Sequence, residues 1–228
     1  MDKWRAICFD LDGVLIDSMP LHAEAWRQAG KKIGLRISKR FIYAHEGEPG
    51  SVTARLLFGA KKNAAGKFQE LLLAKEEYFR KRAKRIRMHR ELVALLSWLN
   101  ARRIPLALVT GTSWGEVQRV VSKPVLRRFK AIITGDRVKR GKPNPDPYLA
   151  AFKALRVRAE QAVVIENAPY GIESARRAKA GLVVAYASSL PKRFLCDADW
   201  VGASSKSVAG YLKGVVGNSL LQKNKRGK

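Results

Sequence analysis

Two aspartates, Asp10 and Asp12, directly follow the first apolar run of the chain and are separated by one residue. At this spacing on a strand end, both carboxylates point to the same side of a sheet. Two negative charges this close raise at least one pKa unless a cation lies beside them. The spacing therefore predicts a divalent-metal site or a division of roles between a nucleophile and a proton donor. The simpler alternative is a solvated Asp-x-Asp-Gly turn.

Two further segments carry groups that could bind phosphate. Thr110, Gly111 and Thr112 follow another apolar run and offer hydroxyl and backbone N–H donors to phosphate oxygens. Lys142 lies between a glycine and a proline, which favours a turn that fixes the position of its ammonium group. Each segment alone is a weak signal, but both supply donors of the kind that a phosphoryl group requires.

Two side chains with oxygen ligands, Glu166 and Asn167, end a third apolar run. Carboxylate and amide oxygens are the ligands that Mg²⁺ prefers in proteins. Together with the segments above, the chain therefore has a candidate nucleophile and proton donor, threonine hydroxyls that could bind phosphate, a lysine and a candidate metal site. Phosphoryl transfer through a carboxylate needs this combination of groups.

The elements that must position these residues alternate between strands and helices. Such alternation predicts an α/β fold with a mostly parallel sheet that is covered by helices on both faces. Sheets of this kind bind ligands at the carboxyl ends of their strands, where the candidate residues fall. The predicted strands are the short apolar, β-branched runs at 6–11, 106–110, 131–134, 162–166 and 182–187.

The segment 18–87 has a different pattern, with one helix-like stretch after another and almost no strand signal. We expect it to form an α-helical cap domain, inserted between the first two strands of a core domain formed by residues 1–17 and 88–228. A connection of this length is unusual as a loop, but it suits a lid that closes over a site and excludes water.

The composition indicates a folded protein with anionic ligands. Hydrophobic residues make up 46% of the 228 residues, and 45 Lys and Arg against 19 Asp and Glu give a net charge of +26. A charge of this sign attracts phosphate-bearing partners. Two cysteines are too few for a disulfide scaffold, and no apolar run has the roughly 18 residues of a membrane helix. We therefore expect a cytoplasmic protein without membrane contact; the oligomeric state stays open, with a monomer among the possibilities.

The chain has four motifs in order: Asp10 with Asp12, Thr110, Lys142, and Glu166 with Asn167. With these motifs the chain resembles the haloacid dehalogenase (HAD) superfamily of phosphotransferases over nearly its whole length. More narrowly, it is similar to the β-phosphoglucomutase-like subgroup, which has an α-helical cap. The resemblance implies a Rossmann-like core, a Mg²⁺ cofactor and an aspartyl-phosphate intermediate. By position, Asp10 is expected to be the nucleophile and Asp12 the general acid and base, with its backbone carbonyl on the metal. Thr110 and Lys142 are expected to hold the phosphoryl group, aided by the Gly111–Thr112 segment.

Asp12 distinguishes two reactions of this superfamily. A dehalogenase expels halide, which needs no proton. A phosphatase must protonate an oxygen leaving group and later deprotonate the attacking water. The second carboxylate therefore favours phosphate chemistry over dehalogenation.

The fourth motif departs from the subgroup pattern, because Glu166 is followed by Asn167 where a second acid is typical. Both remain candidate metal ligands, although the amide removes one negative charge and should weaken Mg²⁺ binding. The chain also resembles HAD-type inorganic pyrophosphatases, in which a cap glutamate reaches the metal; this resemblance assigns that role to Glu46. It likewise assigns a contact with substrate phosphate to Lys75. His22, on the first cap helix, either faces the same cleft or packs in the cap.

The expected function is therefore Mg²⁺-dependent hydrolysis of a small phosphorylated substrate, pyrophosphate first and sugar phosphates second. A sugar-phosphate mutase must hold a second phosphate, and the cap loop 45–50 contains two glutamates and no Lys or Arg, which argues against it. A hypothesis from another class is a basic nucleic-acid-binding protein on a HAD scaffold. The sequence shows no stacking motif or binding module for nucleic acid, so this partner is not expected. Filter binding that falls steeply with salt would indicate it.

Overall fold

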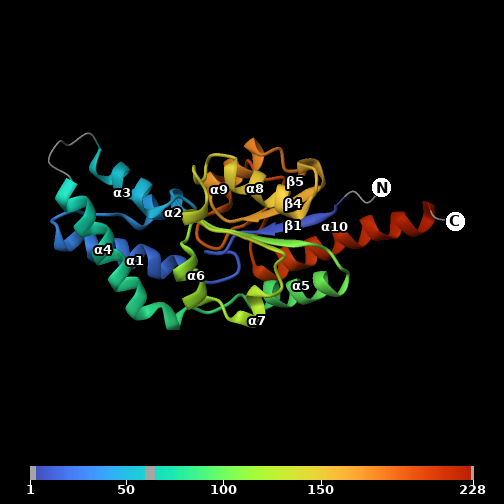
Figure 1. Cartoon of the computed structure of the whole chain (residues 1–228), viewed down its shortest axis with the longest axis horizontal. Coiled ribbons are helices and arrows are strands. Elements are labelled where there is room, and N and C mark those ends of the chain that lie inside the picture. The colour runs from blue at the N-terminus through green and yellow to red at the C-terminus, as the bar shows by residue number, and fades with distance from the viewer. Residues whose placement is uncertain (1–3, 60–64, 227–228) are drawn as a thin grey trace.

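The computed structural model describes residues 4–59 and 65–226. The parts of the predicted domains at residues 1–3, 60–64 and 227–228 lie outside the described residues. Six strands in the described ranges form one parallel sheet in the order β3-β2-β1-β4-β5-β6, which confirms the predicted α/β class (Figure 1). The strands are β1 (Ala6–Phe9), β2 (Leu106–Val109), β3 (Ala131–Ile133), β4 (Ala162–Glu166), β5 (Leu182–Tyr186) and β6 (Trp200–Gly202).

Helices cover both faces of this sheet. One face packs against α5 (Arg90–Ala101) and α10 (Ser205–Arg226), and the other packs against α8 (Asp146–Leu155) and α9 (Pro169–Arg177). Two short helices, α6 (Trp114–Val120) and α7 (Lys123–Leu126), lie between β2 and β3. This is the α/β core that the strand pattern predicts, with the Rossmann-like form that the family resemblance implies.

The central strand β1 contributes to the hydrophobic clusters on both faces of the sheet. Ile7 and Phe9 point into the cluster under α5 and α10, whereas Ala6 and Cys8 point into the cluster under α8 and α9. Side chains alternate along a strand, so both faces of a central parallel strand must be apolar. All four side chains are fully buried, which fixes the position of the residues that follow Phe9.

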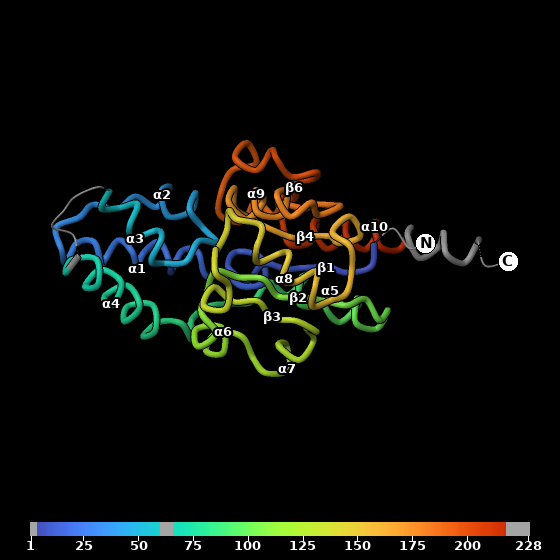
Figure 2. The backbone as a smooth tube through the Cα atoms, turned by 45° about the horizontal axis from the view of Figure 1, so that its top comes forward, coloured from blue at the N-terminus to red at the C-terminus, as the bar shows by residue number. Residues whose placement is uncertain are grey.

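Residues after β1 form a separate helical lobe, which we call the cap lobe. It contains α1 (Met19–Lys32), α2 (Lys39–Ala44), α3 (Gly50–Phe58) and α4 (Ala65–Arg82), followed by the short 3₁₀ helix η1 (Ala83–Arg85). The lobe has its own apolar cluster around Trp26, Ile42 and Leu71. In the tube view it lies beside the carboxyl edge of the sheet (Figure 2).

The two connections between the lobes run side by side. The Asp17 amide donates to the Arg87 carbonyl at 2.8 Å, and Ile16 bridges to Met88. Paired crossings at these positions support our proposal that residues 18–87 form the cap domain.

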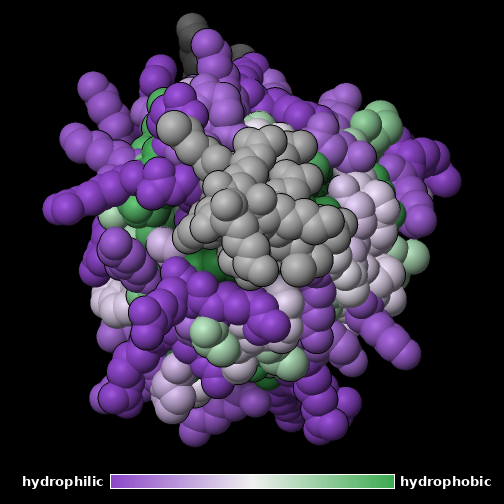
Figure 3. Space-filling model, turned by 90° about the vertical axis from the view of Figure 1, so that its right-hand side faces the viewer, coloured by the Kyte–Doolittle hydropathy of each residue, from purple (hydrophilic) through white to green (hydrophobic). Residues whose placement is uncertain are grey.

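Hydrophilic side chains cover most of the visible face at the terminal end of the molecule (Figure 3). Within the described ranges, no helix is long and apolar enough to cross a membrane. The apolar residues that the sequence holds are instead concentrated in the clusters around the sheet and inside the cap lobe.

Candidate active site

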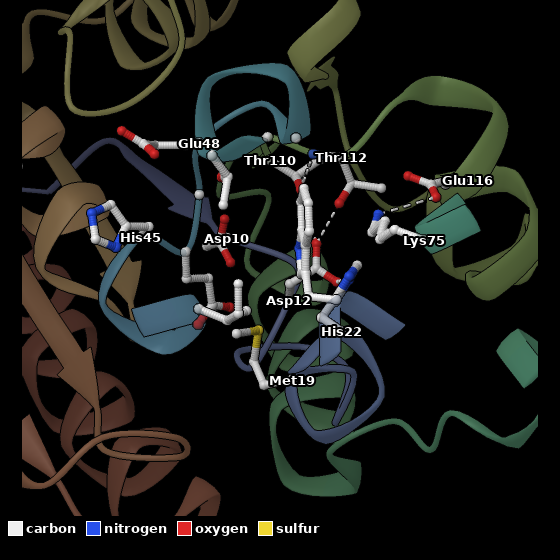
Figure 4. Close-up of a pocket in the computed structure, with 17 residues that line it drawn as sticks. Asp10, Asp12, Met19, His22, His45, Glu48, Lys75, Thr110, Thr112 and Glu116 are labelled. Carbon is white, nitrogen blue, oxygen red and sulfur yellow. Dashed lines mark hydrogen bonds and ion pairs between the residues drawn. The ribbon is translucent and has the colours of Figure 1, made fainter. Parts of the chain in front are cut away.

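A pocket of about 80 Å³ lies between the cap lobe and the carboxyl ends of β1 and β2 (Figure 4). Residues predicted from separate motifs converge on it. The core contributes Asp10, Asp12, Thr110, Gly111, Thr112 and Glu116, and the cap lobe contributes His22, His45, Glu46, Glu48, Thr53 and Lys75.

Asp10 lies at the base of this pocket, directly after β1. Its Oδ1 accepts a hydrogen bond from Lys142 Nζ at 2.6 Å, and its backbone amide donates to the Ile165 carbonyl of β4. Lys142 also donates to Glu166 Oε1 at 2.5 Å. The exposed fractions of Asp10, Lys142 and Glu166 are 2%, 2% and 1%, so the structure holds a buried ammonium between two carboxylates.

Glu166 has contacts that differ from the metal-ligand role predicted for it. Its Oε1 accepts from Lys142 and from the Tyr148 hydroxyl, and its Oε2 accepts from the backbone N–H of Asn167 at 3.1 Å. These protein donors contact both oxygens, and Glu166 positions Lys142; the metal-ligand role expected for Glu166 stays a prediction. No local sequence pattern marks Tyr148, because its contact with Glu166 joins α8 to the end of β4.

The buried charges of Asp10, Glu166 and Lys142 shift one another's pKa values. Burial lowers the pKa of Lys142, but Asp10 and Glu166 raise it overall above its ordinary range, so the lysine stays protonated. Burial raises the pKa of Asp10, Lys142 lowers it, and the charges of Glu166 and Asp12 raise it again. The net direction is upward, because burial, helped by the neighbouring carboxylates, outweighs the effect of Lys142.

Asp12 has a separate set of partners, mostly hydroxyl groups. Ser18 Oγ donates to Oδ1 at 2.6 Å, and Thr112 Oγ1 and Thr110 Oγ1 donate to Oδ2 at 2.6 and 3.3 Å. His22 Nε2 lies 3.1 Å from Oδ1. The threonine hydroxyls therefore contact Asp12, and their contact with phosphate stays a prediction.

These contacts hold Asp12 in its ionised form. Burial raises its pKa, but the charge of His22 and the hydrogen bonds from His22, Ser18 and Thr112 bring it well below its ordinary range. Of the two positions expected for His22, the structure shows the one that faces the cleft. Its ring stacks on Phe79 with centroids 4.2 Å apart. Ser18 is the contact that sequence reasoning missed, although it directly precedes α1.

Glu46 of the cap lobe reaches the core. Its Oε2 accepts from Asn167 Nδ2 at 2.8 Å, and its side chain is buried. Burial and the nearby Asp10 charge raise the pKa of Glu46 well above its ordinary range. Three buried oxygens here have no hydrogen-bond partner within the described part of the chain: Asp10 Oδ2, Glu46 Oε1 and Asn167 Oδ1.

These three oxygens fit a hard divalent cation. Buried carboxylate and amide oxygens normally find partners, and Mg²⁺ is bound by oxygens of these types. Among the described residues, no group of three or more His, Cys, Asp or Glu side chains has a metal-binding arrangement. A cation at this position would therefore depend on the amide of Asn167 as well as on carboxylates.

The cap loop between α2 and α3 lies directly on the core loops. A Cβ on Gly111 would lie 2.4 Å from the Gly47 carbonyl oxygen, and a Cβ on Gly47 would lie 2.8 Å from Lys142 Cδ. Gly47 also has a φ of +88°, which other residues rarely adopt. Gly111, predicted to bind phosphate, thus lines the pocket and also permits the close approach of the cap loop.

Two further acids face the pocket at its sides. Glu48 is half-buried with Oε2 unpartnered among the described residues, and burial raises its pKa to about 7. Glu116, on α6, lies with Oε1 3.7 Å from Lys75 Nζ. In Figure 4 the Lys75 and Glu116 pair and the Glu48 carboxylate lie on opposite sides of Asp10 and Asp12. Sequence reasoning did not place Glu116 in the site, because nothing in α6 marks it.

The chain is similar to several known phosphatases and to a putative phosphomutase. The chain is 32% identical over 174 residues to hexitol phosphatase A from Escherichia coli, covering 75% of this chain and 78% of the relative. It is 29% identical to a putative pyrophosphatase, PpaX, from Caldanaerobacter subterraneus, covering 85% and 86%. A putative beta-phosphoglucomutase from Bacteroides vulgatus superposes with a TM-score of 0.82 at 27% identity, covering 96% and 91%.

The family model for haloacid dehalogenase-like hydrolases matches residues 4–179, which include the cap lobe and the four motifs. The matched range ends after α9 and therefore contains every side chain placed in the pocket above. With this match and the phosphatases among its relatives, the chain belongs to the haloacid dehalogenase-like hydrolase family and is an enzyme of the phosphatase type.

Proposed function

We propose that this protein is a Mg²⁺-dependent phosphohydrolase that forms an aspartyl-phosphate at Asp10. The observation that supports this most strongly is the state of the Asp10 carboxylate. Lys142 holds its Oδ1, while its Oδ2 is buried without a partner in the described structure. A carboxylate fixed in this way can bond to phosphorus through one oxygen and contact a cation through the other.

In the first step, an oxygen of Asp10 bonds to phosphorus, and the bond from phosphorus to the leaving oxygen breaks. Asp12 donates a proton to that leaving oxygen. Because Asp12 is ionised in the structure, its carboxyl group must take up a proton before it acts as the acid. His22 Nε2 lies 3.1 Å from Asp12 Oδ1 and holds this side chain in place.

In the second step, water attacks phosphorus, and the bond between phosphorus and Asp10 breaks. Asp12 accepts the proton of this water, a role for which its lowered pKa keeps it in the correct form. Lys142 keeps the Asp10 oxygen in place through both steps and balances the negative charge around it.

Asp10, Glu46 and Asn167 would hold Mg²⁺, together with the Asp12 carbonyl that the family resemblance suggests. The bound ion supplies positive charge that offsets the buried carboxylates and the charge of the phosphoryl group. Glu46 brings one ligand from the cap lobe, so cap closure and completion of this site are coupled in our proposal.

A small polyol or sugar monophosphate is the substrate that the pocket supports best. Among the residues that line it, Lys75 is the single Lys or Arg, and Glu116 lies beside it. Carboxylates such as Glu48 and Glu116 can accept hydrogen bonds from hydroxyl groups, and the hexitol phosphatase relative fits this chemistry. This reverses the order expected from the sequence, which placed pyrophosphate first.

Pyrophosphate remains a second candidate for two reasons. Lys75 is buried in the pocket wall and could contact a leaving phosphate, and a putative pyrophosphatase covers most of the chain. The mutase alternative also has a similar solved structure, the putative beta-phosphoglucomutase, but the pocket favours it less, since a second phosphate would meet one lysine that is already paired with Glu116.

A phosphate-release screen tests the proposed function. It would compare hexitol phosphates, hexose phosphates, pyrophosphate and nucleotides, each with and without Mg²⁺. The proposal requires Mg²⁺-dependent release from at least one small phosphate compound. Release without added metal in the presence of a chelator, or no release from any compound, would contradict it.

Glu46→Gln is expected to raise the Mg²⁺ concentration needed for half-maximal activity by roughly tenfold. The amide keeps the size of the side chain and an acceptor for Asn167 but removes a negative charge from the proposed metal site. Titration of activity with Mg²⁺ measures the effect. Glu48→Gln is the matched control, because it removes a charge from the same loop with no contact to Asn167; equal Mg²⁺ curves for both variants would exclude Glu46 as a ligand.

Gly111→Ala is expected to lower kcat/KM by roughly 10- to 100-fold while the core stays folded. The new Cβ would lie 2.4 Å from a backbone oxygen of the cap loop, so this loop must move away from Lys142. Gly115→Ala is the control, since nothing lies within 4 Å of its added Cβ. Steady-state kinetics and urea unfolding of both variants check this prediction, and normal kinetics in Gly111→Ala would show that the close approach is unnecessary.

A further inference from the structure

An ion pair joins the two lobes at the wall of the pocket. Lys75 comes from α4 of the cap lobe and Glu116 from α6 of the core, and Nζ lies 3.7 Å from Oε1. Their side chains are only 10% and 17% exposed, and both line the pocket. Figure 4 shows the two side chains facing each other beside Asp12 and His22.

The Lys75 ammonium has a second contact that fixes its place. It lies 5.2 Å from the centre of the Phe79 ring, and this ring stacks on His22, which contacts Asp12. A continuous series of contacts therefore runs from Glu116 to the proposed proton donor. The pair lines the same pocket as Asp12, and the leaving oxygen must come within reach of Asp12 in that pocket.

Helix capping does not account for the position of the Glu116 side chain. Ser113 Oγ accepts from the Glu116 amide at 3.4 Å and caps α6. In a capping box the glutamate would turn back toward the Ser113 amide. Here its Oε1 lies near Lys75 across the lobe boundary, at a distance longer than a charge-assisted hydrogen bond.

The charges at this wall cancel. Lys75 carries one positive charge and Glu116 one negative charge, and Glu48 and Glu46 add carboxylates elsewhere in the pocket. A leaving group with its own phosphate would meet no net positive charge here. A leaving group with hydroxyls would meet carboxylate acceptors and an ammonium donor.

We propose that Glu116 is a specificity-determining residue, which neutralises Lys75 so that the enzyme favours monophosphates of hydroxylated leaving groups over bisphosphates and pyrophosphate. This inference rests on the proposed function and names its substrate class. Specificity arises in this way when a site contains an element that disfavours the competing ligand. Glu116 contacts Lys75 and not the phosphoryl group. It therefore affects which leaving group binds and takes no part in the bond changes at phosphorus.

The test is Glu116→Gln, measured with sorbitol 6-phosphate, fructose 1,6-bisphosphate and pyrophosphate. Glutamine keeps the size of the side chain, and the Ser113 cap uses only the backbone N–H of residue 116, so the variant removes the charge alone. We expect the kcat/KM ratio of bisphosphate to monophosphate to rise roughly three- to tenfold, which is the range for a partly screened charge. The exposed Glu70→Gln on α4 controls for net charge and should leave the ratio unchanged.

The effect must also act through Lys75. In a Lys75→Met background, Glu116→Gln is expected to change the ratio by less than about twofold, because the neutralised partner is absent. An unchanged ratio in Glu116→Gln, or an equal rise in the Lys75→Met background, would overturn the inference while phosphate hydrolysis itself stands.

A binding measurement separates this inference from the proposed function. Calorimetry in the inactive Asp10→Asn background would compare fructose 6-phosphate with fructose 1,6-bisphosphate, with and without Glu116→Gln. Tighter binding of the bisphosphate in the double variant supports the inference even if turnover is slow. Binding of both sugars with the same preference in the two proteins overturns the inference alone. Failure of either protein to bind any sugar phosphate overturns the inference and the preference for sugar monophosphates, whereas the proposed hydrolysis itself is decided by the phosphate-release screen.

Discussion

Asp10→Asn is expected to lower phosphate release by about 10⁴-fold or more, because the amide cannot form the acyl-phosphate that the proposed reaction requires. Asn is close in size to Asp and its carbonyl oxygen can still accept from Lys142 Nζ, so the contact at 2.6 Å need not be lost. Single-turnover phosphate release with the best substrate of the screen gives the measurement.

Circular dichroism and thermal unfolding serve as the controls for this variant. We expect a folded protein, since the substitution removes one negative charge from a buried cluster that also contains Asp12, Glu46 and Glu166. A folded Asp10→Asn protein that retains activity within about tenfold of the original would rule out covalent catalysis at this position.

Lys142→Met is expected to cost about 3–5 kcal/mol of stability as well as activity, because it leaves buried carboxylates without their countercharge. Lys142 is the ammonium that contacts both Asp10 and Glu166, and its side chain is 1% exposed. Urea unfolding at neutral pH measures the loss. Full stability in this variant would mean that the buried charges are compensated in another way.

The pH dependence of this loss has a defined sign. Burial and neighbouring carboxylates already raise the pKa of Asp10, and removal of Lys142 takes away the group that lowers it. With a folded-state pKa above the unfolded value, the native state holds its proton more tightly, so stability falls as the pH rises through that interval. Lys142→Met should therefore lose less stability near pH 5 than near pH 8. The double variant with Glu166→Gln should recover part of the loss at both values.

Most of the sheet can be predicted from sequence because a central parallel strand must be apolar on both faces. The main error lies at the strand ends. The pattern predicts a strand over 6–11, whereas β1 ends at Phe9, because Leu11 is buried in the turn and prolongs the apolar pattern beyond the ladder. The segments α2 and β6 have six and three residues, too few to show a period, and they were not predicted.

The sequence identifies several residues of the candidate site but not the contacts between them. Asp10, Asp12 and Asn167 follow directly from motifs at strand ends, which the topology brings to one edge of the sheet. Lys142 was predicted from its Gly-Lys-Pro turn, which lies in the loop between β3 and α8. The contact of Glu166 with Lys142 depends on how two distant loops pack, and no local pattern reports it.

The residues from the cap lobe needed different information. The family resemblance led to Glu46 and Lys75, and both lie in the pocket. No role was predicted for Glu116 or for Ser18; their contacts form where the two lobes meet. Residues that act across a lobe boundary are thus the ones that a single sequence conceals.

The most direct test of the account is detection of the phosphoryl group on Asp10 itself. The enzyme would be quenched in acid during turnover of its best substrate with Mg²⁺, digested, and examined by mass spectrometry, with Asp10→Asn treated in parallel. We predict a phosphorylated peptide whose modified residue is Asp10 in the active enzyme, and no such species in the variant. A turnover-competent enzyme with no phosphoryl group on this peptide at any quench time, or with the group on another residue, would contradict the proposed chemistry.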